Sequence, residues 1–174
     1  EWKNDIRHGW GKSTQCDGET YEGEWKDGKK DGTGRSRDKD GNIYKGEWKG
    51  GKRDGRGRSE NKDCRYEGEW KNNGKHGIGR EILTDGSIFE GEWGNDERNG
   101  VGRLKGKCGY SYGGGWESNK RSGGGKETLP NGDTFEGTWC HDHKNKGRQT
   151  LTDGGIYEGG FEGHGKYGEG KLTY

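Results

Sequence analysis

Tryptophan recurs along this chain at a near-constant interval. Seven of the eight tryptophans stand 22 or 23 residues apart, and a phenylalanine takes the eighth place in the series. The series is Trp2, Trp25, Trp48, Trp70, Trp93, Trp116, Trp139 and Phe161. Self-similarity at a fixed period of this length is typical of a repeat architecture, so the period constrains the fold more strongly than any other feature of the chain.

Each Trp stands inside a longer pattern. A second aromatic residue lies four positions before seven of the eight members of the series, with a glycine midway, as in the segment from Tyr21 to Trp25. Alternation along an extended strand puts Tyr21, Gly23 and Trp25 on one face and the two glutamates between them on the other. A Gly-x-Gly-basic segment, such as 32–35, begins seven residues after the Trp. It predicts a returning strand, and therefore one β-hairpin per unit.

Asp-Gly and Asn-Gly pairs precede the next aromatic in most units and supply the turn between hairpins. The predicted fold is therefore all-β: an elongated, single-layer antiparallel ribbon of about eight tandem β-hairpins, the first of them truncated. We expect one continuous repeat array over residues 1–174. The units over 139–174 are expected to be irregular, because Asn-Lys-Gly at 145–147 stands where Gly-x-Gly belongs and Phe161 replaces Trp.

The composition alone would suggest disorder, since only 20% of residues are apolar and 36% are charged. The aromatic residues argue otherwise, because 15 of the 19 occupy the two repeat positions. We expect their rings to stack along the ribbon as a ladder, with the glycines of Gly-x-Gly leaving room for them. A net charge of +1 is not typical of nucleic-acid binding, so no nucleic-acid partner is expected. No bilayer-spanning apolar run or signal pattern is present, which predicts an intracellular chain.

The candidates for chemistry are weak. The run 140–143, Cys-His-Asp-His, holds four potential metal ligands, but adjacent residues point in different directions and no second Cys/His pair completes a site. The Gly-Lys segments lack the glycine spacing of a phosphate-binding loop. Acidic residues recur with the repeat and do not converge on a base or nucleophile. We therefore predict no catalytic residue, no metal, no cofactor and no enzymatic activity.

The pattern aromatic-x-Gly-x-Trp, followed by Gly-x-Gly and Asp-Gly, resembles the MORN repeat over essentially the whole chain, most closely in the unit 21–34. The resemblance implies an extended ribbon of β-hairpins that serves as a scaffold. Such repeats occur in radial spoke heads and other axonemal proteins, in cytoskeletal proteins, in junctophilins and as accessory segments of some enzymes. The resemblance therefore implies a kind of module and not a single task.

The aromatic-glycine face is the predicted partner-binding surface, because a half-covered apolar face offers a groove to an amphipathic helix or an extended peptide. The alternative is that the rings only pack on one another. The residues predicted on this face are Tyr21, Trp25, Tyr44, Trp48, Tyr66, Trp70, Phe89, Trp93, Tyr112, Trp116, Phe135 and Trp139.

Basic residues gather just after each Trp and are predicted to line one edge of the ribbon. Such an edge suits anionic phospholipid headgroups or an acidic protein. The alternative is a solvated row of hairpin turns. The candidate residues are Lys26, Lys29, Lys30, Lys49, Lys52, Arg53, Lys71 and Lys75.

The first functional hypothesis is a non-enzymatic structural scaffold and protein–protein interaction ribbon, in a ciliary axoneme as a radial-spoke-like component or in another cytoskeletal assembly. Its partners would be other proteins of a large assembly, with self-association through unpaired strand edges. One alternative is a peripheral membrane module that binds anionic phospholipids. Another is a regulatory segment of a larger enzyme whose catalytic domain lies outside these residues. The start of the chain in mid-unit predicts that it is a stretch of a longer protein.

Overall fold

The computed structural model describes residues 2–3, 6–163 and 165–174. The side chain of Trp2, the first member of the tryptophan series, lies outside the described residues. The chain divides into two compact units, an N-terminal one formed by Glu1–Thr84 with Gly94–Asp96 and a C-terminal one formed by Asp85–Trp93 with Glu97–Tyr174. The prediction of one continuous array over 1–174 stays a prediction.

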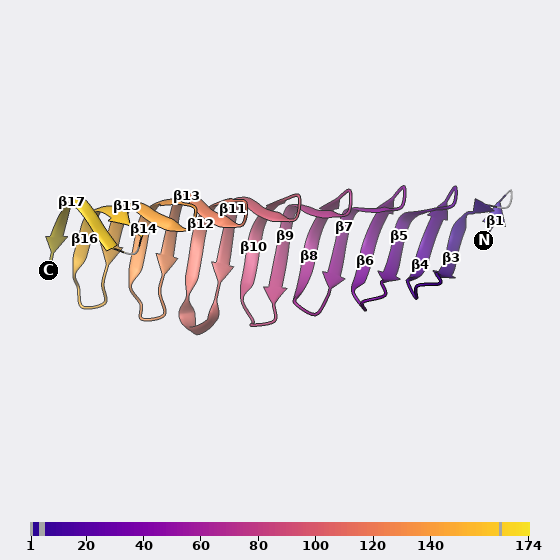
Figure 1. Ribbon diagram of the computed structural model, residues 1–174, viewed down its shortest axis with the longest axis horizontal. Helices are drawn as coiled ribbons and strands as arrows, with labels where there is room; N and C mark the ends of the chain where they lie inside the picture. Colours follow the sequence, from indigo (N-terminus) through magenta and orange to yellow (C-terminus); the bar gives the residue numbers. More distant parts are fainter. Residues whose placement is uncertain (1, 4–5, 164) are drawn as a thin grey trace. The chain divides into compact units, whose positions relative to one another are not determined.

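The N-terminal unit is an antiparallel sheet of hairpins (Figure 1). A short pair, β1 and β2, precedes the strands β3 to β9, which lie in chain order within the sheet. The strands are β1 Trp2–Lys3, β2 Ile6–Arg7, β3 Gly9–Thr14, β4 Thr20–Lys26, β5 Lys29–Arg37, β6 Ile43–Lys49, β7 Lys52–Glu60, β8 Cys64–Lys71 and β9 Gly74–Leu83.

The C-terminal unit repeats this arrangement with the strands β10 to β17, again in chain order and antiparallel. A single 3₁₀ turn, η1, connects two of its hairpins. The elements are β10 Ile88–Gly94, β11 Glu97–Lys105, η1 Lys107–Gly109, β12 Ser111–Glu117, β13 Lys120–Thr128, β14 Thr134–Cys140, β15 His143–Thr150, β16 Ile156–Glu162 and β17 Gly165–Thr173. The predicted all-β fold of tandem antiparallel hairpins is confirmed.

In the six hairpins from β4–β5 to β14–β15, the turn has two central residues with positive φ, such as Asp27 at 49° and Gly28 at 76°. Two positive φ angles define the type I′ turn, whose twist matches that of the flanking strands. Asn72 and Asn73 make the same turn without glycine, which is consistent with the tolerance of asparagine for left-handed backbone. These two-residue turns hold the register of the hairpins.

The two glycines of Gly-x-Gly have different tasks. Between β4 and β5, Gly23 pairs with Gly34 while Trp25 pairs with Lys30, so β5 carries extra residues in a bulge. The first glycine, Gly32, lies in this bulge with φ of 88°, a conformation that other residues rarely adopt. A Cβ on the second glycine, Gly34, would collide with the ring of Tyr21. The expectation that both glycines make room for rings is therefore right only for the second.

The core is the predicted ladder of rings. Its aromatic side chains are 0–8% exposed, and neighbouring rings meet edge to face. Tyr44 lies between Trp48 and Trp70, with ring centroids 5.1 Å from each and interplanar angles of 89° and 82°. In the C-terminal unit, Tyr112 lies between Trp116 at 5.3 Å and Trp139 at 5.4 Å. Edge-to-face contacts of this kind stabilise by about 0.5–1.5 kcal/mol each beyond the burial of area.

Candidate functional site

A row of basic side chains covers the aromatic ladder. The residue five positions after each Trp pairs with or lies beside that Trp in the hairpin, so both point to the same face, as Trp25 and Lys30 do. The Nζ atom of Lys30 lies 4.8 Å from the Trp48 ring centroid, and the guanidinium of Arg53 lies 4.3 Å from that of Trp70. The covering residues are Arg7, Lys30, Arg53, Lys75, Arg98, Arg121, Lys144 and Lys166.

Carboxylates secure several of these cations. Lys30 pairs with Glu19 at 2.5 Å, and Lys75 pairs with Glu81. In the C-terminal unit, Arg121 and Lys144 share Glu127, at 2.6 and 2.9 Å, and Glu127 is only 4% exposed. A buried carboxylate with two cationic partners is compensated, so this cluster has a structural role.

Burial also changes the acidity of tyrosine hydroxyls in the ladder. It raises the pKa of Tyr21 and of Tyr112 to about 12. The neutral hydroxyls donate hydrogen bonds to the backbone carbonyl oxygens of Glu24, at 3.0 Å, and Gly115, at 3.1 Å. Each hydroxyl thus has an acceptor inside its own hairpin.

The ring and cation contacts show where the residues of the predicted partner-binding face lie. All twelve residues of the predicted partner-binding face are buried, each exposed by 8% or less, and pack on one another beneath the basic side chains. A partner at this face stays a prediction, but it would meet the covering cations before the rings. The sequence analysis missed this cover, although a basic residue five positions after all eight members of the series was visible in the repeat.

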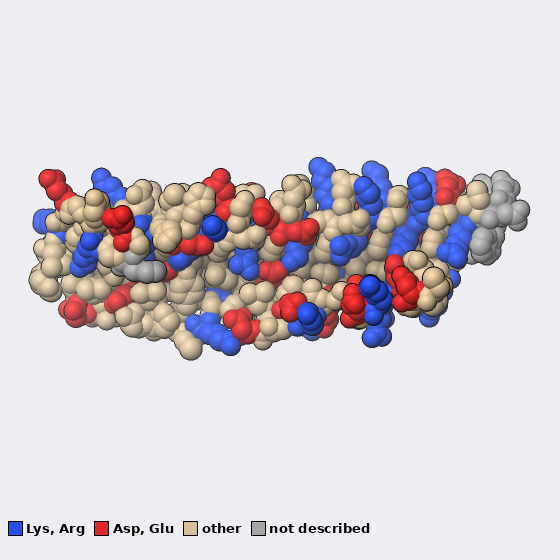
Figure 2. All heavy atoms as spheres, viewed as in Figure 1, with Lys and Arg blue, Asp and Glu red and all other residues tan. Residues whose placement is uncertain are grey.

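The predicted basic edge divides into two groups. Lys30, Arg53 and Lys75 do not project from the edge, because they lie over the rings. The other five predicted residues are exposed at or beside the two-residue turns, where Lys and Arg side chains gather in Figure 2: Lys26, Lys29, Lys49, Lys52 and Lys71. Only this second group is available to an anionic partner at the edge.

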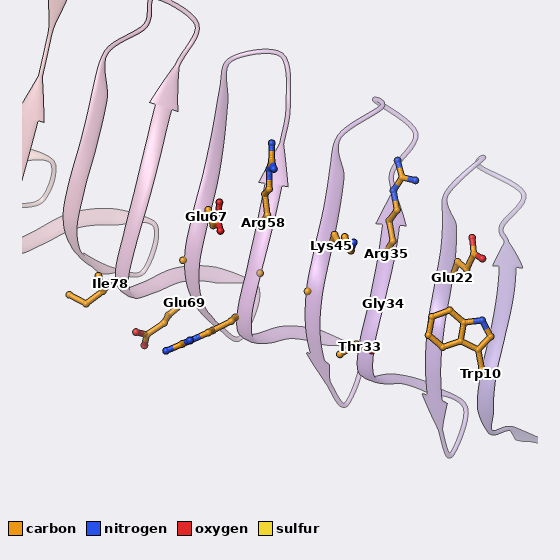
Figure 3. A pocket seen from close by; sticks show the side chains of 14 residues that line it. Trp10, Glu22, Thr33, Gly34, Arg35, Lys45, Arg58, Glu67, Glu69 and Ile78 are labelled. Carbon is orange, nitrogen blue, oxygen red and sulfur yellow. The ribbon is translucent and has the colours of Figure 1, made fainter.

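The opposite face of the N-terminal unit is hollowed by a groove of about 700 Å³ (Figure 3). Its floor is backbone at glycines of the repeat, and its walls are two rows of side chains that point away from the aromatic ladder. One row consists of Glu22, Arg35, Lys45, Arg58 and Glu67. The other consists of Trp10, Thr33, Arg56, Glu69 and Ile78. Trp10 is 56% exposed and Ile78 is 61% exposed.

Some glutamates of this face are engaged by the bulges. The carboxylate of Glu24 accepts hydrogen bonds from the Thr33 N–H at 2.9 Å and from its hydroxyl at 2.7 Å. The hydrogen bond from the Thr33 hydroxyl, with that from its N–H, holds the pKa of Glu24 below its usual value. Glu47 accepts in the same way from the N–H of Arg56 at 3.1 Å. These carboxylates accept hydrogen bonds from the backbone of the bulges and are therefore not oriented toward a ligand.

The potential metal ligands near residue 140 do not converge on one point, although two of them are in contact. His141 and Asp142 form a two-residue turn, with φ of 48° and 73°, and the carboxylate of Asp142 accepts a hydrogen bond from Arg121. The Sγ atom of Cys140 lies 3.4 Å from Nδ1 of His141. Within 6–163 and 165–174, no three side chains of His, Cys, Asp or Glu converge as a metal ion would need.

Hairpins of this repeat, with their ring ladder and bulge glycines, match a known family. The family model for the MORN repeat matches residues 1–20, 21–43, 44–60, 66–88, 89–107 and 112–134. The chain belongs to the MORN repeat family. The matched segments cover more than half of it and end at residue 134. The prediction of irregular MORN units over 139–174 stays a prediction.

Other comparisons add little to the MORN assignment. No curated protein matches this chain. Among solved structures, it is similar to the TCP domain of Drosophila melanogaster SAS-4 (dCPAP), solved in complex with a proline-rich motif of Ana2 (dSTIL). That match is 13% identical, covers 86% of this chain and 76% of that chain, and has a TM-score of 0.47. A similarity this low carries no argument about the function of these MORN repeats. In the described residues, no helix has the length and hydrophobicity that crossing a membrane requires.

Proposed function

We propose that this MORN-repeat chain is a non-enzymatic scaffold that binds other proteins within a cytoskeletal assembly, specifically a ciliary axoneme in a radial-spoke-like role. The observation that supports a binding role is the open groove of about 700 Å³ on the face opposite the aromatic ladder. Its walls are exposed charged side chains with exposed apolar residues at its ends, a composition suited to a protein surface or segment.

The scaffold role also fits how the side chains of the sheet are used. One face is occupied by rings and the cations over them, which leaves the other face, the turns and the edges for contacts. Hydrogen bonds between successive hairpin turns, such as Asn73 N–H to the Arg53 carbonyl at 2.9 Å, hold the repeats in a fixed register. A binding surface held on regular strands is more precise than one on loops.

Extraction of native cells and of isolated cilia with detergent at physiological salt tests this proposal. We expect mass spectrometry to find the protein in the insoluble cytoskeletal pellet, and crosslinking to join lysines of this chain to neighbouring proteins. Retention in isolated axonemes would support the ciliary role, whereas retention only in the cortical pellet of whole cells would replace it with another cytoskeletal site. Release with the detergent-soluble membrane fraction would overturn the scaffold proposal.

A second candidate function is binding to anionic phospholipids, favoured by the exposed lysines at the turns of the N-terminal unit (Figure 2). Each basic residue close to an anionic membrane adds about 1 kcal/mol. Co-sedimentation with phosphatidylserine vesicles would support this candidate if replacing Lys26, Lys29, Lys49 and Lys52 with Gln abolished it. Replacing the loop residues Lys39 and Lys62 with Gln serves as the control. Equal loss in both variants would contradict a specific edge.

A further inference from the structure

One row of the groove breaks the charge pattern of the repeat. The position after the leading aromatic of each hairpin is Glu22, Glu67, Glu90, Glu136 or Glu158 in five units, a glycine in one, and Lys45 in one. Lys45 is therefore the only cation at a position that is otherwise acidic or glycine. It lies on β6, in the middle of the groove wall (Figure 3).

The strand register turns this one residue into a cluster of three positive charges. Lys45 stands directly opposite Arg35 on β5 and directly opposite Arg58 on β7. With strands about 4.8 Å apart, the three cations occupy a width of about 10 Å. Like charges directly opposite each other destabilise a sheet. The same row elsewhere alternates acid and base, as in Lys126–Glu136 at 3.5 Å and Arg148–Glu158 at 3.4 Å.

The three cations have acidic neighbours only at the two ends of the cluster, where Glu22 stands opposite Arg35 and Glu67 stands opposite Arg58. All three side chains are exposed, and none of them forms an ion pair within 4.0 Å of a described carboxylate. Glu47, two residues along β6, is occupied by the Arg56 N–H of the bulge. Arg56 adds a fourth exposed cation in the facing row. Beyond the cluster, Glu22 and Glu67 restore the negative charge of the row on either side.

The apolar groups of the groove lie at its two ends. Trp10 belongs to β3 and Ile78 to β9, six strands apart, with exposed fractions of 56% and 61%. Six strand spacings amount to about 29 Å before curvature is considered. A helix of about 19 residues or an extended segment of about 9 residues spans this distance.

We propose that the groove of the N-terminal unit binds an acidic segment of a partner protein, with its carboxylates over Arg35, Lys45 and Arg58 and an apolar residue near each end, at Trp10 and Ile78. The inference rests on the proposed scaffold function and names the chemistry of one partner. A segment of protein fits better than a membrane. The cations stand at mid-strand between acids that would repel a uniformly anionic surface, whereas a peptide can place its own cations beside Glu22 and Glu67.

The decisive variant is Lys45→Glu, because it affects folding and binding in opposite directions. It restores the alternation Arg35–acid–Arg58, so we expect the protein to unfold at a slightly higher temperature. It also removes the central cation of the cluster, so we expect an acidic ligand to bind about tenfold more weakly. Loss of binding in a more stable protein cannot be attributed to misfolding. Lys62→Glu, the same charge change at an exposed loop residue outside the groove, is the matched control.

The probe is a labelled peptide with a central run of glutamates and a leucine near each end, measured by fluorescence anisotropy with the whole chain. We expect binding that weakens with salt, a tenfold loss for Lys45→Glu and no loss for Lys62→Glu or for Lys45→Arg. A peptide with glutamine in place of glutamate should bind poorly. Equal loss in the Lys45→Glu and Lys62→Glu variants, or binding of phosphatidylserine vesicles that depends on Lys45 while the peptide does not bind, would overturn the inference. If the peptide fails to bind while the protein stays in the cytoskeletal pellet, the inference fails and the scaffold function stands.

Discussion

The hairpins of the two units carry the same ring ladder, but some hairpins of the C-terminal unit lack the carboxylate that reinforces the bulge, although Glu92 there still accepts the Val101 N–H at 3.1 Å. In the N-terminal unit the residue before Trp is a glutamate, and the carboxylates of Glu24 and Glu47 accept the N–H groups of the bulge. In the C-terminal unit this residue is Gly115 or Gly160 in two hairpins. The bulge persists there without a carboxylate, since Gly123 still has a φ of 71° and the register still shifts between Gly114 and Trp116. The left-handed glycine and the register define the bulge, and the carboxylate only reinforces it.

The hairpin of Trp139 leads to the same conclusion, because it lacks the first glycine of Gly-x-Gly. Here Thr138 pairs with Lys146 and Trp139 with Lys144, so the bulge is shorter than in the other hairpins. Asn145 stands where the first glycine would be, and its φ is not positive. The glycine and the extra residue are lost together. The glycine is therefore required by the length of the bulge and not by the aromatic ring.

The largest expected difference between the units concerns their tyrosines. Tyr44 contacts two tryptophan rings, so Tyr44→Ala should lower the free energy of unfolding of its unit by about 3–5 kcal/mol. Tyr157 has one ring contact among the described residues, with Phe161 at 5.2 Å, and Tyr157→Ala should cost about 2 kcal/mol. Hydrogen exchange with mass spectrometry resolves the two units in one experiment. Equal losses would show that ring contacts do not set the stability of the ladder.

A second prediction tests whether the missing acids of the hairpin at Trp116 can be restored. A Cβ at Gly115 would collide with the carbonyl oxygen of Ser122, so Gly115→Glu should destabilise the C-terminal unit by about 1–3 kcal/mol. A Cβ at Gly113 would meet no atom within 4 Å. Gly113 stands opposite Arg103 on one side and Lys126 on the other, so Gly113→Glu should stabilise the unit by about 0.2–1 kcal/mol. Thermal unfolding of both variants measures the contrast. A stable Gly115→Glu variant would mean that the bulge accepts the glutamate of the N-terminal hairpins.

The third prediction concerns the indole N–H groups. Nε1 of Trp70 donates a hydrogen bond to the Gly57 carbonyl oxygen at 3.1 Å. Nε1 of Trp139 is also buried, but it has no hydrogen-bond partner among the described residues. Phenylalanine removes ring volume at both sites, but it removes a hydrogen bond only at Trp70. Trp70→Phe should therefore cost about 1 kcal/mol more than Trp139→Phe in denaturant unfolding. Phe161 shows that the repeat accepts phenylalanine at this position.

Periodicity was sufficient to predict the hairpins, the turns and the ring ladder, because these follow from local alternation and spacing. The role of Gly32 was not predictable from spacing, since a glycine under a ring and a glycine in a bulge look identical in the sequence. The cover over the rings required the register of β4 and β5, which places Lys30 on the face of Trp25. The register depends on the bulge, which spacing alone does not reveal. The sequence analysis therefore placed these cations at the edge of the ribbon.

The groove was missed for a related reason. Sequence reasoning sought an exposed apolar face and selected the rings, but their burial under basic side chains moves the open surface to the charged face. The signal for its central feature was present in the sequence, because Lys45 replaces the glutamate of the other units. Its meaning appears only when the register sets it opposite Arg35 and Arg58.

The last contrast between the units comes from the tyrosine hydroxyls. The leading aromatic of the hairpin is phenylalanine in two hairpins of the C-terminal unit, at Phe89 and Phe135, whereas the described hairpins of the N-terminal unit have tyrosine there, as at Tyr21. Tyr21→Phe removes the hydrogen bond to the Glu24 carbonyl and should cost about 1 kcal/mol at pH 7. The ring contacts with Trp25 and Trp48 are kept.

Alkaline pH should reverse the sign of this effect. Burial raises the pKa of Tyr21 from 10.0 to about 12, so its stabilising contribution is complete below pH 10 and is lost as the pH rises through 12. Phenylalanine cannot ionise, and the Tyr21→Phe variant should therefore lose less stability over that range. Denaturant unfolding followed by tryptophan fluorescence at several pH values should give stability curves that cross above pH 10. Tyr174→Phe, at a side chain that is 90% exposed, is the control and should follow the unsubstituted protein. Parallel curves for Tyr21→Phe would mean that the hydroxyl ionises as readily in the folded ladder as in water.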